Sequence, residues 1–178
     1  MPKKNTIQDL LQDEIKDLYS AETQLTKAIP KMVKGSSDPR LKEAFSSHLK
    51  ETVEQRQRLE QVAEMLGMRA SGKKCVGMEG CIKEGAEALG EDGDENVVDL
   101  GIIGAGGRVE HYEMAGYTTA IGLAQKIGLT EAVQLLKLSL TEEQAADKKL
   151  RAIGAGLMKS APAKAAAAAG SGEADRDA

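Results

Sequence analysis

The chain has 178 residues, enough for one domain with a hydrophobic core, and its 41% hydrophobic and 29% charged residues are ordinary for a soluble globular protein. Good helix formers such as Ala, Leu, Glu and Lys are plentiful, whereas there are one Phe, three Tyr and no Trp, which favours an all-α fold over a β-rich one. The formal net charge of −4, with acidic and basic residues interleaved, argues against a nucleic-acid partner.

The sequence predicts no membrane or secretory segment. The first residues lead straight into an amphipathic pattern, and the longest apolar runs are much shorter than a membrane span. Cys75 and Cys81 are too few for a disulfide framework and have no neighbouring Cys or His to complete a zinc site. We therefore expect free thiols, no membrane partner and a cytoplasmic location.

Two long helices are predicted in the first third of the chain. The first begins after Thr6, which can cap it together with Asp9, and it closes in the segment 34–37. Asp38 and Pro39 then provide a cap and a first helical residue for a second helix, which Gly67 ends. The turn between these helices is tight, so we expect them to be antiparallel neighbours.

The helical pattern breaks over residues 67–96, which hold seven of the nineteen glycines. At most a short helix fits there, around Ile82–Leu89. A third long helix is predicted over Val97–Ile127, and a fourth begins after Thr130 as its cap. One long connection between two hairpins is the ferritin-like form of the antiparallel four-helix bundle. The expected domains are a bundle at 1–159 and an Ala-rich, low-complexity, disordered tail at 160–178.

Polar residues interrupt the apolar face of each predicted helix near its middle. These candidate metal ligands are Glu22 on the first helix, His48 and Glu51 on the second, Glu110 and Glu113 on the third, and Glu143 and Asp147 on the fourth. Because residues three and four apart share a helix face, each helix is expected to point at least one carboxylate inward.

The acids are also predicted to lie at matching heights. In an antiparallel hairpin, two residues equally far from the turn are level. Glu22 and Glu51 stand about 15 residues from the first turn, and Glu113 and Glu143 about 15 residues from the second. If the two hairpins dock as similar halves, the four carboxylates converge.

A group of buried carboxylates needs compensation, since each buried, uncompensated ion costs several kcal/mol. Some acids are then protonated, or basic side chains reach them, or cations bind between them. Oxygen ligands with an occasional imidazole suit iron or manganese. A single inward Glu is more often solvated at the edge of its stripe, so the prediction of a metal site depends on the joint pattern.

Several segments together match the motifs of a known family. They are Leu18–Glu22, His48–Thr52, Cys75–Gly80 with Glu84, Glu110–Glu113 with Tyr117, and Glu142 and Glu143 with Asp147. With these motifs, residues 5–158 resemble the YciE/YciF family of bacterial ferritin-like stress proteins. The resemblance implies a fold similar to that of rubrerythrins and ferritins, a homodimer, a link to stress responses, and metal ligands at Glu22, Glu51, Glu110, Glu113 and Glu143.

The chain departs from the usual ferritin-like ligand pattern of two single Glu and two Glu-x-x-His pairs. The second helix has the reverse order, His48-x-x-Glu51, and the third has Glu110-x-x-Glu113. His48 is therefore expected to lie above the site, either as a ligand or as a hydrogen-bond partner of one. Because the ligand set differs from the usual one, the resemblance alone does not determine how many metal ions bind or which metal they are.

Three further features bear on the site and on helix packing. Tyr112 and Tyr117 either pack structurally or serve the site, by a hydrogen bond to a ligand carboxylate or by electron transfer, and His111 is expected to be exposed or at an interface. The glycines at 101–107 lack the spacing of a nucleotide-binding loop and are better explained by close helix packing.

Three functions are compatible with this sequence. The first is a di-iron or manganese protein that oxidises Fe(II) with oxygen or peroxide, and so would be an oxidoreductase. The second is a non-enzymatic structural or interaction bundle with a vestigial or single-ion site. The third is iron storage in a shell, which needs higher-order assembly.

Overall fold

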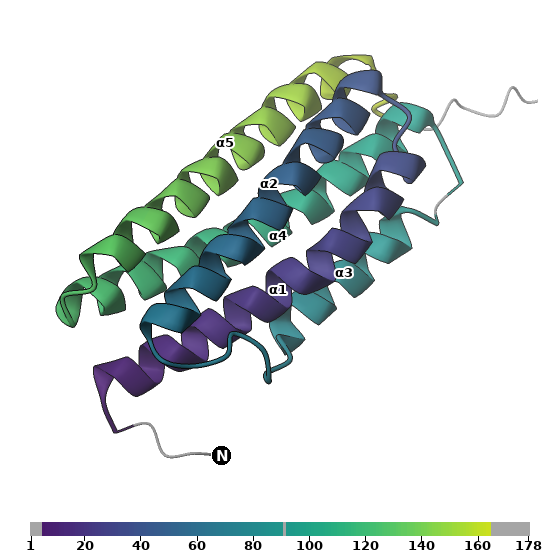
Figure 1. Ribbon diagram of the computed structural model, residues 1–178. Helices are drawn as coiled ribbons and strands as arrows, with labels where there is room; N and C mark the ends of the chain where they lie inside the picture. The colour runs from purple at the N-terminus through teal and green to yellow at the C-terminus, as the bar shows by residue number, and fades with distance from the viewer. Residues whose placement is uncertain (1–4, 91, 165–178) are drawn as a thin grey trace, which may run out of the picture.

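Helices make up most of the described part of the chain. The computed structural model describes residues 5–90 and 92–164, in which no strand occurs. The helices are α1 (Ile7–Gly35), α2 (Pro39–Met65), α3 (Val76–Ala88), α4 (Glu95–Lys126) and α5 (Thr130–Ser160). In Figure 1 the four long helices run side by side, and α3 lies against α1 and α4. The predicted all-α, ferritin-like bundle is confirmed.

Local capping explains most helix boundaries. Thr6 and Asp9 form the predicted capping box of α1. Asp38 caps α2 ahead of Pro39, and Gly67, with φ of 66°, follows its last turn. The predicted cap of α5 is wrong, because Thr130 is its first helical residue and no side chain caps it. Ser160 ends α5, and most of the predicted tail, residues 165–178, lies outside the described residues.

The connection between the hairpins contains a longer helix than the sequence predicts. α3 begins at Val76, six residues before the expected start, and the backbone N–H of Met78 donates to Sγ of Cys75 at its N-terminus. Glycines lower helix propensity, but Gly77 is needed here, since a Cβ at this position would lie 2.6 Å from the ring of Tyr112. Tertiary packing therefore offsets the poor propensity.

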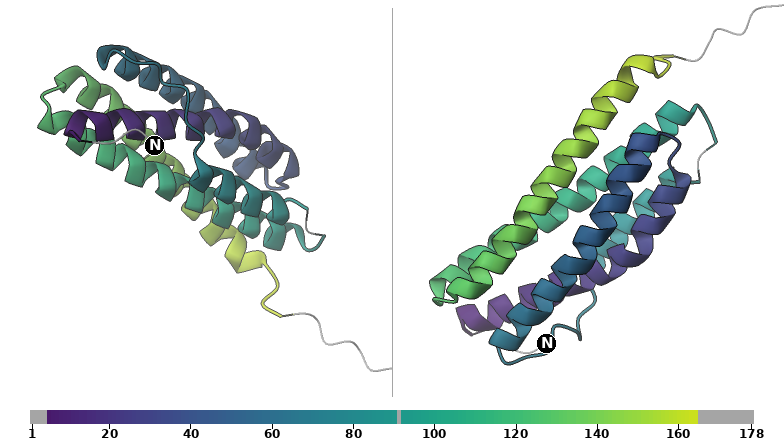
Figure 2. Two further views of the ribbon diagram at one scale, coloured as in Figure 1. Left: turned by 90° about the horizontal axis from the view of Figure 1, so that it is seen from below. Right: turned by 45° about the horizontal axis from the view of Figure 1, so that its top comes forward.

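The connection carries the chain from one end of the bundle to the other. The backbone N–H of Cys75 donates to Oγ of Ser20 near the middle of α1, and Leu89 packs against Gly35 at its end. α3 is thus parallel to α1, and the left view in Figure 2 shows it along the outside of the bundle. No helix in the described part of the chain is long and apolar enough to cross a membrane.

A carboxylate of α4 holds the turn between α1 and α2. The backbone N–H groups of Ser37 and Asp38 donate to the two oxygens of Asp99, at 2.8 and 2.7 Å. Asp99 is buried, and these bonds satisfy both of its oxygens. The second hairpin is thereby fixed to the turn of the first.

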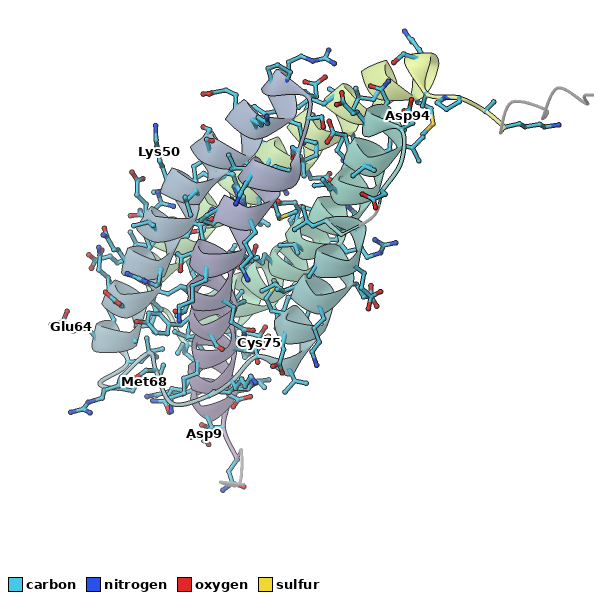
Figure 3. All side chains as sticks on the ribbon, turned by 90° about the vertical axis from the view of Figure 1, so that its right-hand side faces the viewer. Asp9, Lys50, Glu64, Met68, Cys75 and Asp94 are labelled. Carbon is cyan, nitrogen blue, oxygen red and sulfur yellow. The ribbon has the colours of Figure 1, made fainter. Side chains whose placement is uncertain are left out.

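The hydrophobic core is divided into two clusters along the bundle axis. One cluster, toward the N-terminal end of α1, includes Leu11, Ile15, Leu59, Tyr117 and Leu136. The other, toward its C-terminal end, includes Leu25, Ile29, Phe45, Ile102 and Leu150. Charged side chains cover the outside, as the labelled Lys50 and Glu64 illustrate in Figure 3. Between the two apolar clusters lies a layer of buried polar side chains.

Candidate metal centre

This polar layer receives side chains from all four long helices. Its members are Glu22 from α1, His48 from α2, Glu110 and Glu113 from α4, and Glu143 from α5. None of these residues is more than 5% exposed. Of the four carboxylates predicted to converge, Glu22, Glu113 and Glu143 lie in this layer, whereas Glu51 does not.

Four of the five side chains are close enough to share an ion. His48, Glu110, Glu113 and Glu143 each place one nitrogen or oxygen within 4.8 Å of the others. Nε2 of His48 lies 3.4 Å from Oε1 of Glu110 and 3.7 Å from Oε2 of Glu143. Glu22 joins the layer through a neighbouring tyrosine.

Most polar atoms of the layer have no hydrogen-bond partner. The unpartnered buried atoms include both carboxylate oxygens of Glu113 and Glu143, one oxygen each of Glu22 and Glu110, and Nε2 of His48. Among the described residues, no Lys or Arg forms an ion pair with these four glutamates. Buried polar groups are normally paired, so these unpartnered atoms are available to bind a cation. Oxygen-rich donors with one imidazole fit iron or manganese.

The electrostatics of the layer reflect the crowding of its acids. Burial, followed by the charges of neighbouring glutamates, raises the pKa values of Glu22 and Glu113 well above their usual range. Burial and the nearby Glu143 do the same to the pKa of Glu110. Burial alone would lower the pKa of His48, but its bond to Glu51 and the charge of Glu143 raise it overall. The layer therefore holds protons that a bound cation would displace.

Glu51 lies at the edge of the layer and not within it. Its side chain is 39% exposed, in contrast to the inward position expected from the sequence, and its Oε2 lies 3.2 Å from Nδ1 of His48. α2 therefore contributes an imidazole where the other long helices contribute carboxylates. With Nδ1 bonded to Glu51, Nε2 of His48 faces Glu110 and Glu143, the usual arrangement of a metal-binding histidine.

Asp147 is buried, but its carboxylate interacts with basic side chains outside the layer. Arg151 donates to its Oδ2, and Nε2 of His111 lies 3.4 Å from its Oδ1. His111 is 62% exposed, as predicted. Asp147 thus lies one turn beyond Glu143 with its charge already balanced, and it is not part of the close group of four.

The two tyrosines considered at the site have different positions. Tyr117 is fully buried, and its hydroxyl donates to Oε1 of Glu22. The hydroxyl of Tyr112 instead donates to Oδ2 of Asp17 at 2.8 Å and lies 2.9 Å from Sγ of Cys75. Tyr112 therefore holds the connection before α3, and only Tyr117 contacts the polar layer. Both cysteines are free.

An ion pair that the sequence did not predict lies beside the layer. Both terminal nitrogens of Arg58 donate to the carboxylate of Glu142, at 2.6 and 2.8 Å, and Nε2 of Gln55 donates to the same carboxylate. This pair bridges α2 and α5 next to Glu143. The only sequence signal was Glu142 preceding Glu143, and it does not identify a partner from which two intervening helices, α3 and α4, separate it along the chain.

Comparisons with known proteins agree with this fold. The model of a family described as "Domain of unknown function (DUF892)" matches residues 6–163. Protein YciF of Escherichia coli (strain K12) is 42% identical over 146 residues, which cover 82% of this chain and 88% of YciF.

Solved structures give the same result. The crystal structure of the E. coli stress protein YciF matches with a TM-score of 0.85 and 38% identity, covering 89% of this chain and 100% of that one. YcfI from Rhodopseudomonas palustris, whose description suggests a structural protein, matches with a TM-score of 0.80 and 40% identity, covering 85% and 98%. A Xanthomonas campestris protein with 22% identity and a TM-score of 0.67 shares the fold.

Proposed function

This chain belongs to the YciE/YciF family, the family of the domain DUF892, and we propose that it is a ferritin-like dinuclear metal-binding protein that uses iron or manganese in a bacterial stress response. The observation that carries this proposal is the set of unpartnered buried oxygens on Glu22, Glu110, Glu113 and Glu143. The stress role is inferred from the description of its relative, the E. coli stress protein YciF.

The proposed ligands are the five residues of the buried layer. The carboxylates of Glu22, Glu110, Glu113 and Glu143 supply oxygens, and His48 supplies Nε2. Glu51 orients His48 through Nδ1, and it can itself become a ligand by a side-chain rotation because it is half-exposed. Asp147 is a weaker candidate, since Arg151 already neutralises it.

A bound pair of such ions would supply redox chemistry, namely oxidation of Fe(II) by oxygen or peroxide. The chain's own contribution is to hold and shield the centre. The two apolar clusters on either side of the layer exclude bulk water, and the Tyr117 hydroxyl fixes the orientation of Glu22. Protons held by Glu22, Glu110 and Glu113 leave when a cation binds.

Anaerobic titration with Fe(II), followed by a pulse of oxygen or peroxide, tests this function. We expect about two ions per chain, as in the di-iron carboxylate bundles, and rapid oxidation of the bound iron. The control is the double variant Glu22→Ala/Glu113→Ala, which should bind and oxidise far less. Equal uptake by the control and the natural protein would remove the proposal.

The second candidate is a structural or interaction bundle stabilised by one ion. The description of YcfI favours it. It predicts that metal raises the melting temperature by mass action while added Fe(II) is not turned over. Size-exclusion chromatography with light scattering tests the proposed homodimer, and a 24-subunit mass would instead support iron storage. The cytoplasmic location stays a prediction.

A further inference from the structure

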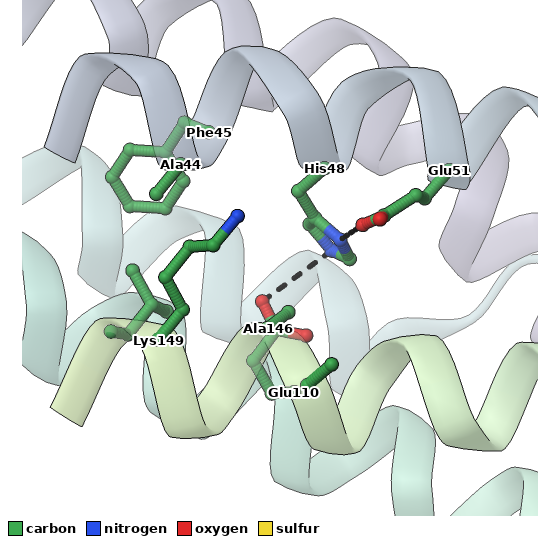
Figure 4. A pocket seen from close by; sticks show the side chains of 9 residues that line it. Ala44, Phe45, His48, Glu51, Glu110, Ala146 and Lys149 are labelled. Carbon is green, nitrogen blue, oxygen red and sulfur yellow. Dashed lines mark hydrogen bonds and ion pairs between the residues drawn. The ribbon is translucent and has the colours of Figure 1, made fainter. Parts of the chain in front are cut away.

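A small opening connects the buried layer to the surface between α2 and α5. It has a volume of about 40 Å³, and Figure 4 shows its lining. α2 contributes Ala44, Phe45, His48 and Glu51, while α5 contributes Ala145, Ala146, Lys149 and Leu150. Glu110 of α4 also lines it. The opening therefore leads from solvent to two members of the layer.

Small side chains create this opening. Ala44, Ala145 and Ala146 stand where larger residues would close the gap between the two helices. At its inner end, Nε2 of His48 and Oε2 of Glu110 are buried and have no hydrogen-bond partner. A gap with only apolar walls is expected to be filled by packing, whereas this opening ends on polar atoms that have no hydrogen-bond partner.

The same helix pair is closed on the other side of the layer. There Arg58 of α2 bonds to Glu142 of α5 through both terminal nitrogens, and it also contacts Ser139. The Arg58 side chain is only 14% exposed, so this ion pair blocks the seam. The ion pair therefore closes this helix pair on one side of the layer, while the three alanines line the opening on the other side.

The charges at the opening favour a cation. The half-exposed carboxylate of Glu51 lies between solvent and His48, and the buried glutamates lie behind it. Figure 4 shows Lys149 extending from α5 across the opening toward α2. Lys149 is exposed, and its positive charge acts on Glu51 without a close ion pair among the described residues, so an arriving cation can replace its ammonium group beside that carboxylate.

We propose that this opening is the entry route for divalent cations, with Glu51 as the first carboxylate to receive the ion and Lys149 as a resident positive charge that the ion displaces. The proposal rests on the proposed function, since it supplies the same centre. It assigns Glu51 and Lys149 roles in loading, and it names a hydrated divalent cation as the solute that passes.

Stopped-flow mixing with Co²⁺ tests the route without any turnover. The chain has three Tyr and no Trp, so tyrosine fluorescence reports quenching by an ion bound beside Tyr117. Equilibrium dialysis gives the Co²⁺ stoichiometry separately. The variants are Ala146→Leu, which fills the opening, and Lys149→Ala, which removes the resident charge. Their matched controls on exposed positions of α5 are Ala152→Leu and Lys148→Ala.

We expect A146L to slow loading roughly tenfold or more at unchanged stoichiometry, because a close-packed wall must open transiently before an ion can pass. K149A should speed loading by roughly two- to tenfold at low salt, with a smaller effect at high salt. Both controls should load at the natural rate.

Natural loading rates in both A146L and K149A would overturn the route while leaving the metal centre intact. If A146L instead binds fewer ions, the comparison of K149A with K148A decides: faster loading by K149A supports the route, and equal rates overturn it. A natural protein that binds no Co²⁺ would overturn the proposed function, and the route with it.

Discussion

Nδ1 of His48 lies 3.2 Å from Oε2 of Glu51, and this contact leaves Nε2 as the ring nitrogen that faces the buried glutamates. The reversed order of the two residues, compared with the usual Glu-x-x-His pair, thus has a structural consequence. The histidine takes the inner position and the glutamate the outer one.

The first prediction concerns this contact. Replacing Glu51 by Gln removes the negative charge that holds the His48 ring, and loss of such an outer partner typically lowers metal affinity about 10- to 100-fold. Equilibrium dialysis with Mn²⁺ measures the change. Glu64→Gln, at an exposed position near the end of α2, should leave the affinity unchanged. An unchanged affinity in E51Q would contradict the orienting role of Glu51.

The second prediction concerns the stability of the metal-free protein. Both oxygens of Glu113 are buried and unpartnered, so Glu113→Leu should raise the free energy of unfolding by about 1–3 kcal/mol when metal is absent. The same variant should lose the stabilisation that added Mn²⁺ gives the natural protein. Urea unfolding with and without chelator measures both effects, and Glu64→Leu serves as the surface control. Destabilisation of the metal-free variant would show that Glu113 has a partner there.

The third prediction is a pH dependence. The pKa values of Glu22, Glu110 and Glu113 are raised above 4.5 by burial and by neighbouring acids. Between 4.5 and these raised values, the folded protein keeps protons that the unfolded chain releases. The metal-free protein should therefore lose up to about 1.4 kcal/mol of stability per pH unit for each such proton as pH rises from 4.5 through the raised folded values.

His48 acts in the same direction. Its pKa is also raised, so its contribution to the stability of the folded protein is lost as pH rises through its pKa in the folded state. Bound metal should reverse the trend, since metal binding requires deprotonated ligands. Unfolding at several pH values, with chelator and with Mn²⁺, gives the two slopes. Parallel slopes would mean that protons and metal do not compete for these carboxylates.

The fourth prediction compares two tyrosines. The buried hydroxyl of Tyr117 donates to Glu22, so Tyr117→Phe should leave Glu22 with no partner and cost about 1–3 kcal/mol. The hydroxyl of Tyr19 donates to Glu60 at an exposed site, so Tyr19→Phe should cost less than about 1 kcal/mol. Thermal unfolding of both variants measures the difference. Equal costs would mean that burial does not strengthen the Tyr117 contact.

The fifth prediction concerns the start of α3. Sγ of Cys75 accepts from the backbone of Met78 and lies within 2.9 Å of both Asp17 and Tyr112. Cys75→Ala should therefore destabilise the crossover by about 1–2 kcal/mol and increase hydrogen exchange in α3. Cys81→Ala is the matched control, at a half-buried position with no such contacts among the described residues. Unchanged exchange in C75A would contradict this role.

The sequence was sufficient for the long helices and for the level of the acids, because a period of 3.6 residues and a symmetric hairpin determine both. Glu22, Glu113 and Glu143 follow from this geometry alone. The start of α3 could not be predicted, since Gly77 and Gly80 disfavour a helix, and the contacts of Cys75 with α1 and of Gly77 with Tyr112 on α4 are tertiary.

Side-chain direction was the other limit. His48 and Glu51 are about 60° apart around α2, and periodicity does not decide which of them a wide apolar face will include. The pair of Arg58 and Glu142 joins α2 to α5, so it depends on how the two hairpins dock. Asp147 and Arg151, in contrast, lie one turn apart on α5, and their i,i+4 spacing could have indicated the contact.

The bonds from Ser37 and Asp38 to Asp99 have a bearing on the buried layer, although they lie at the end of the bundle. They stop one hairpin from sliding along the other. A slip of one helical turn is about 5.4 Å, larger than the 4.8 Å within which His48 meets Glu110, Glu113 and Glu143. A single carboxylate on α4 thus keeps the axial register on which a shared ion depends.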